Sequence, residues 1–446
     1  MKKILPLLLL GSGATAAAAQ EQPNVVVLFV DDLGWADLGY QNSKFESPNI
    51  DQLKTDGVYF SRNYISTATS SPSRASLLTG KEALRCGFVR HIYDVEDPSA
   101  PRPEFQTFEK DPGKMKSRAW LPLEEVTYAE RLKEEGYYNM FVGKWHLGHE
   151  PYYPIHQGFD DMYGTCEHGH PKCYYAPFFN GENPFPNAKA NEDYLTEMLT
   201  DGAEKFIENY DSDKPFLLNM WYYAVHGPIT GRRDLVAKYK SRGMSQIDAT
   251  YAAMVEIVDQ SVGRIRSAIE KKGLADNTIF IFTSDQGGAY SNYPLSGGKM
   301  GGNTLGEGGS RVPLIVYVPG AKANGTTYEE PVQTLDIYPT LVELASGKKC
   351  KEKQIQGVSL MPALNGKSLK GRDLFMHRSY EDQNSAIIDG EWKLIKYRSG
   401  LVKLFNVVDD ISETTNLVNI YPDRTAAMLA RLNKWQEEAT PAELLP

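Results

Sequence analysis

The chain has 446 residues, of which 41% are hydrophobic, and it carries a formal net charge of −9. This length exceeds what one compact core usually holds, so it predicts a large domain and a small one. The acidic balance and the absence of a long Lys/Arg run argue against nucleic acid and anionic membrane surfaces as partners. A local group of cations can still bind a small anion.

The first residues have the pattern of an export signal. Lys2 and Lys3 are followed by an apolar stretch at Ile4–Leu10 and by small residues that end in Ala17–Ala19. The stretch is too short for a transmembrane helix. The alternative is an N-terminal core helix, which the abrupt alanine run disfavours. We therefore interpret residues 1–19 as a signal peptide and expect an exported protein, periplasmic or secreted, with no integral membrane segment after signal removal.

Apolar runs separated by helical patterns organise the next three hundred residues. Continuous β-branched runs are typical of strands buried on both faces of a parallel sheet. The predicted helices carry apolar residues three and four apart or end at a glycine. The predicted strands are Asn24–Val30, Tyr138–Val142, Phe216–Ala224, Thr278–Thr283 and Val312–Val318, and the predicted helices are Thr127–Glu135 and Asp248–Lys271. This alternation predicts a doubly wound α/β domain at residues 20–335.

Past about residue 335 the pattern changes to short strands joined by turn residues. The predicted strands are Leu374–His377, Ser385–Ile388 and Trp392–Tyr397, and a final helical pattern covers Arg424–Glu438. These elements predict a smaller C-terminal subdomain at residues 336–446, an antiparallel sheet with a helix packed on it.

Four cysteines are few for an exported protein that depends on disulfides. The segment from Cys166 to Cys173 contains two histidines, but its spacing does not fit the common structural zinc patterns. We expect either a local disulfide or two free thiols there.

Polar residues follow the carboxyl ends of the predicted parallel strands. They are Asp31 and Asp32, Lys144 and His146, His226, and Asp285 and Gln286. Open α/β sheets bind their ligands in the crevice outside those strand ends, so these side chains are expected to converge on one pocket.

Three of these residues are carboxylates and one is an amide. An all-oxygen set suits a hard cation such as calcium or magnesium better than zinc or copper. Adjacent aspartates such as Asp31 and Asp32 more often occupy a turn or cap a helix. With Asp285 and Gln286 at a second strand end, we favour a metal site.

A Ser/Thr-rich segment, TATSSPSRASLLTG, covers residues 67–80. Pro72 fits the first turn of a helix, which places Ser70 at the helix N-terminus, where free N–H groups favour an anion. Arg74, one turn later, adds a donor for tetrahedral oxyanions. From these residues alone, an ordinary N-cap in a loop remains the simpler interpretation.

The segment Ser70-Ser71-Pro72-Ser73-Arg74, with Leu77–Gly80 behind it, resembles the signature of the type I sulfatase family, which belongs to the alkaline phosphatase superfamily. The resemblance covers nearly the whole mature chain. It extends to NVVVLFVDDLGWADLG at residues 24–39, GKWHLG at 143–148, GFD at 158–160, EGGSRVP at 307–313 and LFNVVDDISETTNL at 404–417. It implies a sulfuric ester hydrolase with an alkaline phosphatase-like fold.

The resemblance also implies roles for single residues. Ser70 would be oxidised to formylglycine by a maturation enzyme, and the aldehyde hydrate would be the nucleophile; serine here resembles the subset matured by a radical-type enzyme. One calcium ion would be bound by Asp31, Asp32, Asp285, Gln286 and the modified Ser70. Arg74 and Lys144 would hold the hydrate, with His146 assisting sulfate release. His226, as general acid, and Lys299 would contact the sulfate and the bridging oxygen.

Two positions depart from the family pattern. Gln286 stands where the family more often has Asn or His, and the interval between Lys299 and Glu307 is longer than in similar family members. Asp37, Glu307 and Arg311 belong to matched segments and are expected to have structural roles.

The substrate is inferred from resemblance only. Leu147–Asp160, with Tyr163 and Gly164 after it, resembles the arylsulfatase and hexosamine-sulfatase branch, which suggests a sulfated galactose or N-acetylgalactosamine unit of a glycan. His168, His170 and Arg90 are candidate sugar contacts because they lie in loops near the motifs; ordinary loop residues are the alternative.

Two rival functions remain open. A phosphatase, phosphodiesterase or phosphonate hydrolase of the same superfamily would use zinc and show more histidine ligands. A glycan-binding protein that never matures Ser70 would do no chemistry, but the full set of charged residues favours an enzyme.

Overall fold

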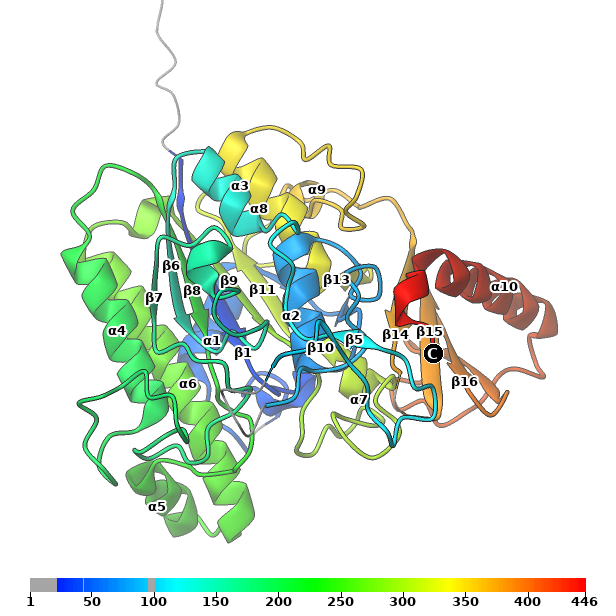
Figure 1. Ribbon diagram of the computed structural model, residues 1–446, viewed down its shortest axis with the longest axis horizontal. Helices are drawn as coiled ribbons and strands as arrows, with labels where there is room; N and C mark the ends of the chain where they lie inside the picture. The colour runs from blue at the N-terminus through cyan, green and yellow to red at the C-terminus, as the bar shows by residue number, and fades with distance from the viewer. Residues whose placement is uncertain (1–21, 43, 95–100, 380) are drawn as a thin grey trace, which may run out of the picture.

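The computed structural model describes residues 22–42, 44–94, 101–379 and 381–446 (Figure 1). The predicted signal peptide at residues 1–19 lies outside these ranges. Within them, no helix combines the length and the apolar composition needed to cross a membrane.

An eight-stranded sheet forms the centre of the molecule, in the order β12-β2-β11-β9-β1-β8-β6-β7. The central strand β1 (Asn24–Val30) pairs in parallel with both β8 (Phe216–Trp221) and β9 (Thr278–Ser284). The outer strands are β6 (Tyr138–Gly143), β7 (Asp161–Tyr163), β11 (Leu314–Tyr317), β2 (Val58–Phe60) and β12 (Thr327–Tyr328). Only β11 runs antiparallel to its neighbours, β9 and β2. The prediction of a large, mostly parallel sheet is confirmed.

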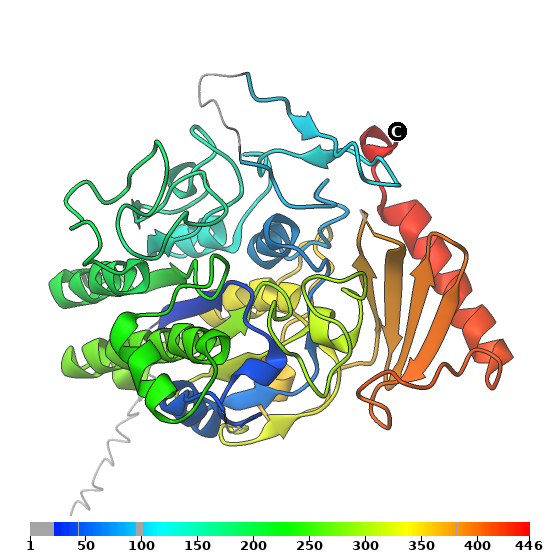
Figure 2. The same cartoon turned by 90° about the horizontal axis from the view of Figure 1, so that it is seen from below.

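Helices cover both faces of this sheet, as a doubly wound fold requires (Figures 1 and 2). One face carries α1 (Pro48–Asp56), α4 (Leu195–Asn209), α5 (Arg233–Ser241) and α6 (Gln246–Lys271), and the other carries α2 (Ser70–Thr79), α3 (Tyr128–Glu134) and α8 (Ile337–Ser346). Because side chains alternate along a strand, Val26 and Leu28 of β1 enter one core while Val27 and Phe29 enter the other.

Two predicted strands differ in the structure. The run 312–318 is divided, because Pro313 cannot donate a ladder hydrogen bond: β10 (Arg311–Val312) joins a small sheet with β3 (Asn63–Tyr64) and β13 (Val332–Gln333), and β11 joins the central sheet. The run 216–224 stops pairing at Trp221.

The remaining elements are short. They are β4 (Phe105–Gln106), β5 (Ser117–Arg118), α7 (Glu307–Ser310), α9 (Met361–Leu364) and the 3-10 turns Trp35–Asp37, Pro154–His156, Ala275–Asn277, Thr334–Asp336 and Ala442–Leu444.

A second, antiparallel sheet lies beside the main body, with α10 (Pro422–Ala439) packed on its outer face (Figure 2). Its strands are β14 (Asp373–His377), β15 (Gln383–Asp389), β16 (Trp392–Tyr397) and β17 (Val402–Asn406), in chain order. The predicted antiparallel sheet and helix are therefore confirmed, with one more strand than expected.

A buried ion-pair network connects this sheet to the main body. Lys393 of β16 lies 3.0 Å from Glu307 of α7 and 3.1 Å from Glu413, and all three side chains are buried. Glu307 also accepts a hydrogen bond from Tyr64 at 3.0 Å and pairs with Arg311. Glu307 and Arg311 thus make structural contacts.

We expect Lys393→Met to destabilise the protein by about 3–5 kcal/mol, because it leaves two buried carboxylates without their shared cation. Denaturant unfolding measures the change. Lys396→Met is the matched control, since Lys396 lies on the other face of β16 and bonds to Asn433 and Gln436 of α10. Equal stability of the two variants would contradict the structural role of Lys393.

Candidate active site

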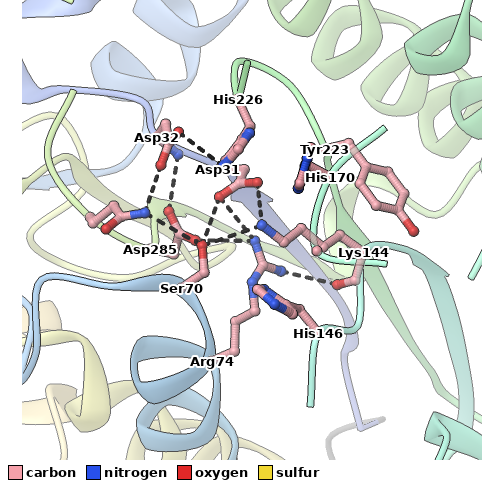
Figure 3. Close-up of polar contacts among 12 residues, drawn as sticks. Asp31, Asp32, Ser70, Arg74, Lys144, His146, His170, Tyr223, His226 and Asp285 are labelled. Atoms are coloured by element: carbon pink, nitrogen blue, oxygen red, sulfur yellow. Dashed lines mark hydrogen bonds and ion pairs between the residues drawn. The ribbon is translucent and has the colours of Figure 1, made fainter. Parts of the chain in front are cut away.

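The polar residues predicted to converge do so at the carboxyl ends of the central strands (Figure 3). Asp31 and Asp32 follow β1, Lys144 and His146 follow β6, His226 lies after β8, and Asp285 and Gln286 follow β9. Ser70 begins α2, whose N-terminus points into the same crevice.

Three buried carboxylates form the floor of the site. Asp31, Asp32 and Asp285 each place an oxygen within 4.8 Å of the others. Asp32 has a left-handed backbone, with φ 61°, and its N–H donates to Asp285 Oδ1 at 3.0 Å. This bend turns the second aspartate back toward the first strand end, so both side chains face the crevice.

Ser70 lies in the middle of this cluster. Its hydroxyl donates to Asp285 Oδ2 at 2.7 Å and lies 3.1 Å from Asp31 Oδ1. Lys144 Nζ lies 3.2 Å from the Ser70 hydroxyl oxygen. Ser70 Oγ is therefore surrounded by carboxylates and a cation, and this is not the geometry of an ordinary N-cap, whose hydroxyl accepts from its own helix.

Two buried cations balance the carboxylates. Lys144 Nζ lies 2.5 Å from Asp31 Oδ2, and Arg74 Nη2 lies 3.2 Å from Asp285 Oδ2. Burial alone would raise the pKa of Asp31, but Lys144 and the other nearby cations bring it to about 2. Burial lowers the pKa of Lys144. Further contacts hold Arg74 in place: its guanidinium packs over the Trp221 ring and donates to the Lys144 carbonyl at 3.0 Å.

Lys299 reaches the site from a long loop. Its Nζ lies 2.5 Å from Asp32 Oδ2, and its N–H donates to Gly288 O at 3.1 Å. Burial alone would lower the pKa of Lys299, but Asp32 raises it. Glu413, from beyond the antiparallel sheet, accepts hydrogen bonds from the Ser296 hydroxyl and from the Glu307 N–H, the latter at 2.7 Å. The loop is thus fixed on both sides of Lys299.

Two histidines face the site with defined proton positions. His226 Nδ1 lies 2.7 Å from the Gly227 carbonyl, so it carries a proton, and Nε2 faces Asp32 at 3.7 Å. His146 Nε2 lies 2.9 Å from the Ile92 carbonyl, which leaves Nδ1 with the lone pair. Among the described residues, no group hydrogen-bonds to that nitrogen. Burial lowers the pKa of both rings.

A cavity of about 440 Å³ opens above Ser70. The described residues that line it are Thr69, Ser70, His91, Ile92, Tyr93, Asp94, His146, Gly169, His170, His226, Gln286, Lys299 and Met300. Of the three predicted sugar contacts, only His170 is among them. His168 stacks on Phe179 beside the cavity, and Arg90 is fully buried with its guanidinium 4.3 Å from the Tyr93 ring centroid.

The segment 91–94, which contributes four lining residues, was missed by sequence reasoning. It lies in an irregular connection after α2, and its only sequence signal is a short group of polar and aromatic residues, His-Ile-Tyr-Asp.

Asp37 has the expected structural role, accepting hydrogen bonds from Gly34 N and the Tyr251 hydroxyl. Cys166 and Cys173 are free thiols, which decides between the two alternatives left by the sequence.

The donor set suits a hard divalent cation. The cluster offers carboxylate oxygens, and among the described residues it includes no sulfur or imidazole ligand. Gln286 turns its Nε2 toward Asp32 Oδ1 at 2.6 Å. Its amide oxygen and nitrogen exchange places when the amide group rotates by half a turn, so the side chain can add a fourth oxygen ligand.

Comparisons with known proteins agree with this geometry. A family model described as "Sulfatase" matches residues 23–348, and one described as "N-sulphoglucosamine sulphohydrolase, C-terminal" matches residues 304–439. The chain is 32% identical to N-acetylgalactosamine-6-sulfatase of Canis lupus familiaris, over 87% of this chain and 74% of that one. It is 30% identical to a sulfatase of Formosa agariphila, over 95% and 89%.

Among solved structures, Ps i-CgsB in complex with k-i-k-neocarrahexaose superimposes with a TM-score of 0.80 at 28% identity. The match covers 95% of this chain and 94% of that one.

We expect calcium to stabilise the protein, because a divalent cation relieves the repulsion among the three buried carboxylates. At a free concentration about 100 times its Kd, bound calcium adds about 2.7 kcal/mol to the free energy of unfolding, and chelation removes it. Thermal unfolding with and without calcium measures the effect.

Asp285→Asn should abolish this calcium-dependent shift. Asp259→Asn is the control, because Asp259 is also buried but lies outside the cluster, where it accepts from Ile50 N and Asn49. A wild-type melting temperature that does not respond to calcium would contradict the cation site.

Proposed function

The chain belongs to the sulfatase family, and on that premise we propose that it hydrolyses O-sulfate esters on carbohydrates, with galactose or N-acetylgalactosamine units of a sulfated glycan as substrates. Family membership makes the chain a sulfuric ester hydrolase. The observation that carries the proposal is the position of Ser70, whose hydroxyl lies between two carboxylates and a lysine below an open cavity.

A maturation enzyme would oxidise Ser70 to formylglycine, whose aldehyde hydrate would supply the oxygen nucleophile. Loss of sulfate would return the aldehyde, and addition of water would restore the hydrate. Lys144 and Arg74 position this residue, since both contact the same carboxylates as Ser70. Their charges also favour the ionised form of a nearby oxygen.

The cations of the site bind and polarise the sulfate group. Lys299 and His226 face the cavity from one side of Asp32, where a sulfate above Ser70 would meet them. Fixed positive charges in a buried site stabilise the charge that develops on the sulfate oxygens. They also explain how an acidic protein accepts an anion.

Two proton transfers are assigned to the histidines. His226 Nε2 is the ring atom that faces the cavity, and because Nδ1 already donates to Gly227, only the imidazolium form can donate from Nε2. Asp32, 3.7 Å from Nε2, favours that form, and we assign His226 as the general acid that protonates the leaving sugar oxygen. His146 keeps a lone pair on Nδ1 and is assigned as the base that assists release of sulfate from the enzyme.

We assign calcium as the cation; Asp31, Asp32, Asp285 and Gln286 would hold it together with the modified Ser70. It would supply charge neutralisation for the sulfate oxygens. Calcium is favoured over magnesium because it accepts irregular sets of oxygen ligands, whereas magnesium demands near-octahedral geometry.

Two kinds of relative support the carbohydrate substrate. One is N-acetylgalactosamine-6-sulfatase, and a solved relative was crystallised in complex with k-i-k-neocarrahexaose. Such polymers occur outside the cytoplasm, in keeping with export through the signal peptide at residues 1–19. Positional specificity is to be identified by assay.

Sulfate release by protein co-produced with its maturation enzyme tests the function. The substrates are N-acetylgalactosamine and galactose sulfated at different positions, with matched phosphate esters. We expect turnover of a sulfated sugar that falls at least about 10³-fold in Ser70→Ala, because the nucleophile is lost.

Ser73→Ala is the matched control and should retain activity. Ser73 lies one turn of helix from the site, where its hydroxyl donates to the Thr67 carbonyl at 2.7 Å. Turnover of phosphate esters alone would move the chain to the phosphatases. Full conversion of Ser70 without turnover of any sulfated sugar would refute the proposed substrate class.

A further inference from the structure

Asp94 is the one acidic side chain among the described residues that line the cavity, apart from the floor of the site. Histidines, Tyr93 and Met300 are among the residues that line the cavity with it, and its side chain is 34% exposed. A carboxylate in a cavity that receives a sulfate ester opposes binding by charge repulsion. It therefore needs a function that outweighs this cost.

The carboxylate is held in one orientation. Asp94 Oδ1 accepts a hydrogen bond from Gly169 N at 3.1 Å, and Oδ2 faces the Nδ1 atoms of His168 at 3.6 Å and His170 at 3.9 Å. Residues 168–170 thus hold the Asp94 carboxylate with one backbone N–H and two imidazole rings.

His168 contacts Asp94 with the ring nitrogen that its backbone hydrogen bond leaves free. Its Nε2 lies 2.9 Å from the Asn180 carbonyl, which only accepts, so Nε2 must donate. Its Nδ1 faces Asp94 Oδ2 at 3.6 Å, and this contact raises the pKa of His168. Burial alone would raise the pKa of Asp94, but the His168 ring and the Gly169 N–H lower it. The Asp94 carboxylate is therefore ionised and acts only as an acceptor.

His170 contacts both Asp94 and the proposed general acid, His226. Its ring stacks on His226, with centroids 5.3 Å apart and an interplanar angle of 22°. The proposed general acid and the Asp94 carboxylate thus both contact His170, and all three line the same cavity. A sugar ring in this cavity can face both residues.

We propose that Asp94 determines specificity by accepting a hydrogen bond from a free hydroxyl on the same sugar ring that carries the scissile sulfate, and by excluding a second sulfate at that position. This inference rests on the proposed carbohydrate sulfatase function. Hydroxyls are the abundant donors of a sugar, and a fixed carboxylate is their acceptor. The same charge repels a second sulfate at that position.

Binding calorimetry on proteins that carry Ser70→Ala tests this proposal without turnover. The ligands are N-acetylgalactosamine 6-sulfate, its 4-deoxy analogue, the 4,6-disulfate and inorganic sulfate. Asp94→Ala removes the acceptor, and Asp94→Asn keeps the shape but removes the charge. Glu150→Gln is the matched control, since Glu150 also pairs with a histidine, His156, at 2.7 Å but does not line the cavity.

We expect Asp94→Ala to weaken binding of the 6-sulfate about 10- to 100-fold, the range for a hydrogen bond to a charged group. The parent should bind the 4-deoxy analogue more weakly than the 6-sulfate by the same factor. Asp94→Ala should weaken binding of the 4-deoxy analogue no further. Asp94→Asn should improve binding of the disulfate relative to the 6-sulfate. Inorganic sulfate should bind the Asp94 variants at least as tightly as it binds the parent, because Asp94 only repels this anion, and this binding shows that the variants are folded.

Three results would overturn the inference. They are unchanged 6-sulfate affinity in Asp94→Ala, a parent that binds the disulfate as tightly as the 6-sulfate, and a parent that binds the 6-sulfate no better than inorganic sulfate. Failure of the proposed function is distinguishable, because it would remove binding of inorganic sulfate from the parent as well.

Discussion

The packing of three aspartates around Ser70 is the constraint on which the rest of the structure depends. Like charges this close in a buried crevice repel strongly, so each needs a cation or a hydrogen-bond donor. Lys144, Arg74 and Lys299 supply the cations from three separate segments of the chain. The central sheet, the start of α2 and the long loop must all be in place before these charges balance.

The C-terminal sheet contributes to this balance from a distance. Glu413 contacts the loop on both sides of Lys299, and Lys393 neutralises Glu413 within the buried network. Glu413, which follows the antiparallel sheet, thus restrains the loop that carries Lys299.

The sequence predicts those features that depend on regular geometry. Parallel strands share one carboxyl edge, so the convergence of Asp31, Lys144 and Asp285 follows from the strand pattern. Contacts made by irregular segments are different, because tertiary packing sets their path. Asp94 was therefore missed, and the sequence could not reveal that Arg90 packs under Tyr93. Pro313 divided a predicted strand because its missing N–H outweighs the apolar pattern on both sides.

A crystal structure of Ser70→Ala grown with calcium and inorganic sulfate tests the central claim most directly. The account predicts one cation bound by Asp31, Asp32, Asp285 and the rotated amide of Gln286, with a sulfate above residue 70 in contact with Lys299 and His226. A cation bound through histidine nitrogens, or a sulfate elsewhere while the cavity holds only water, would contradict it.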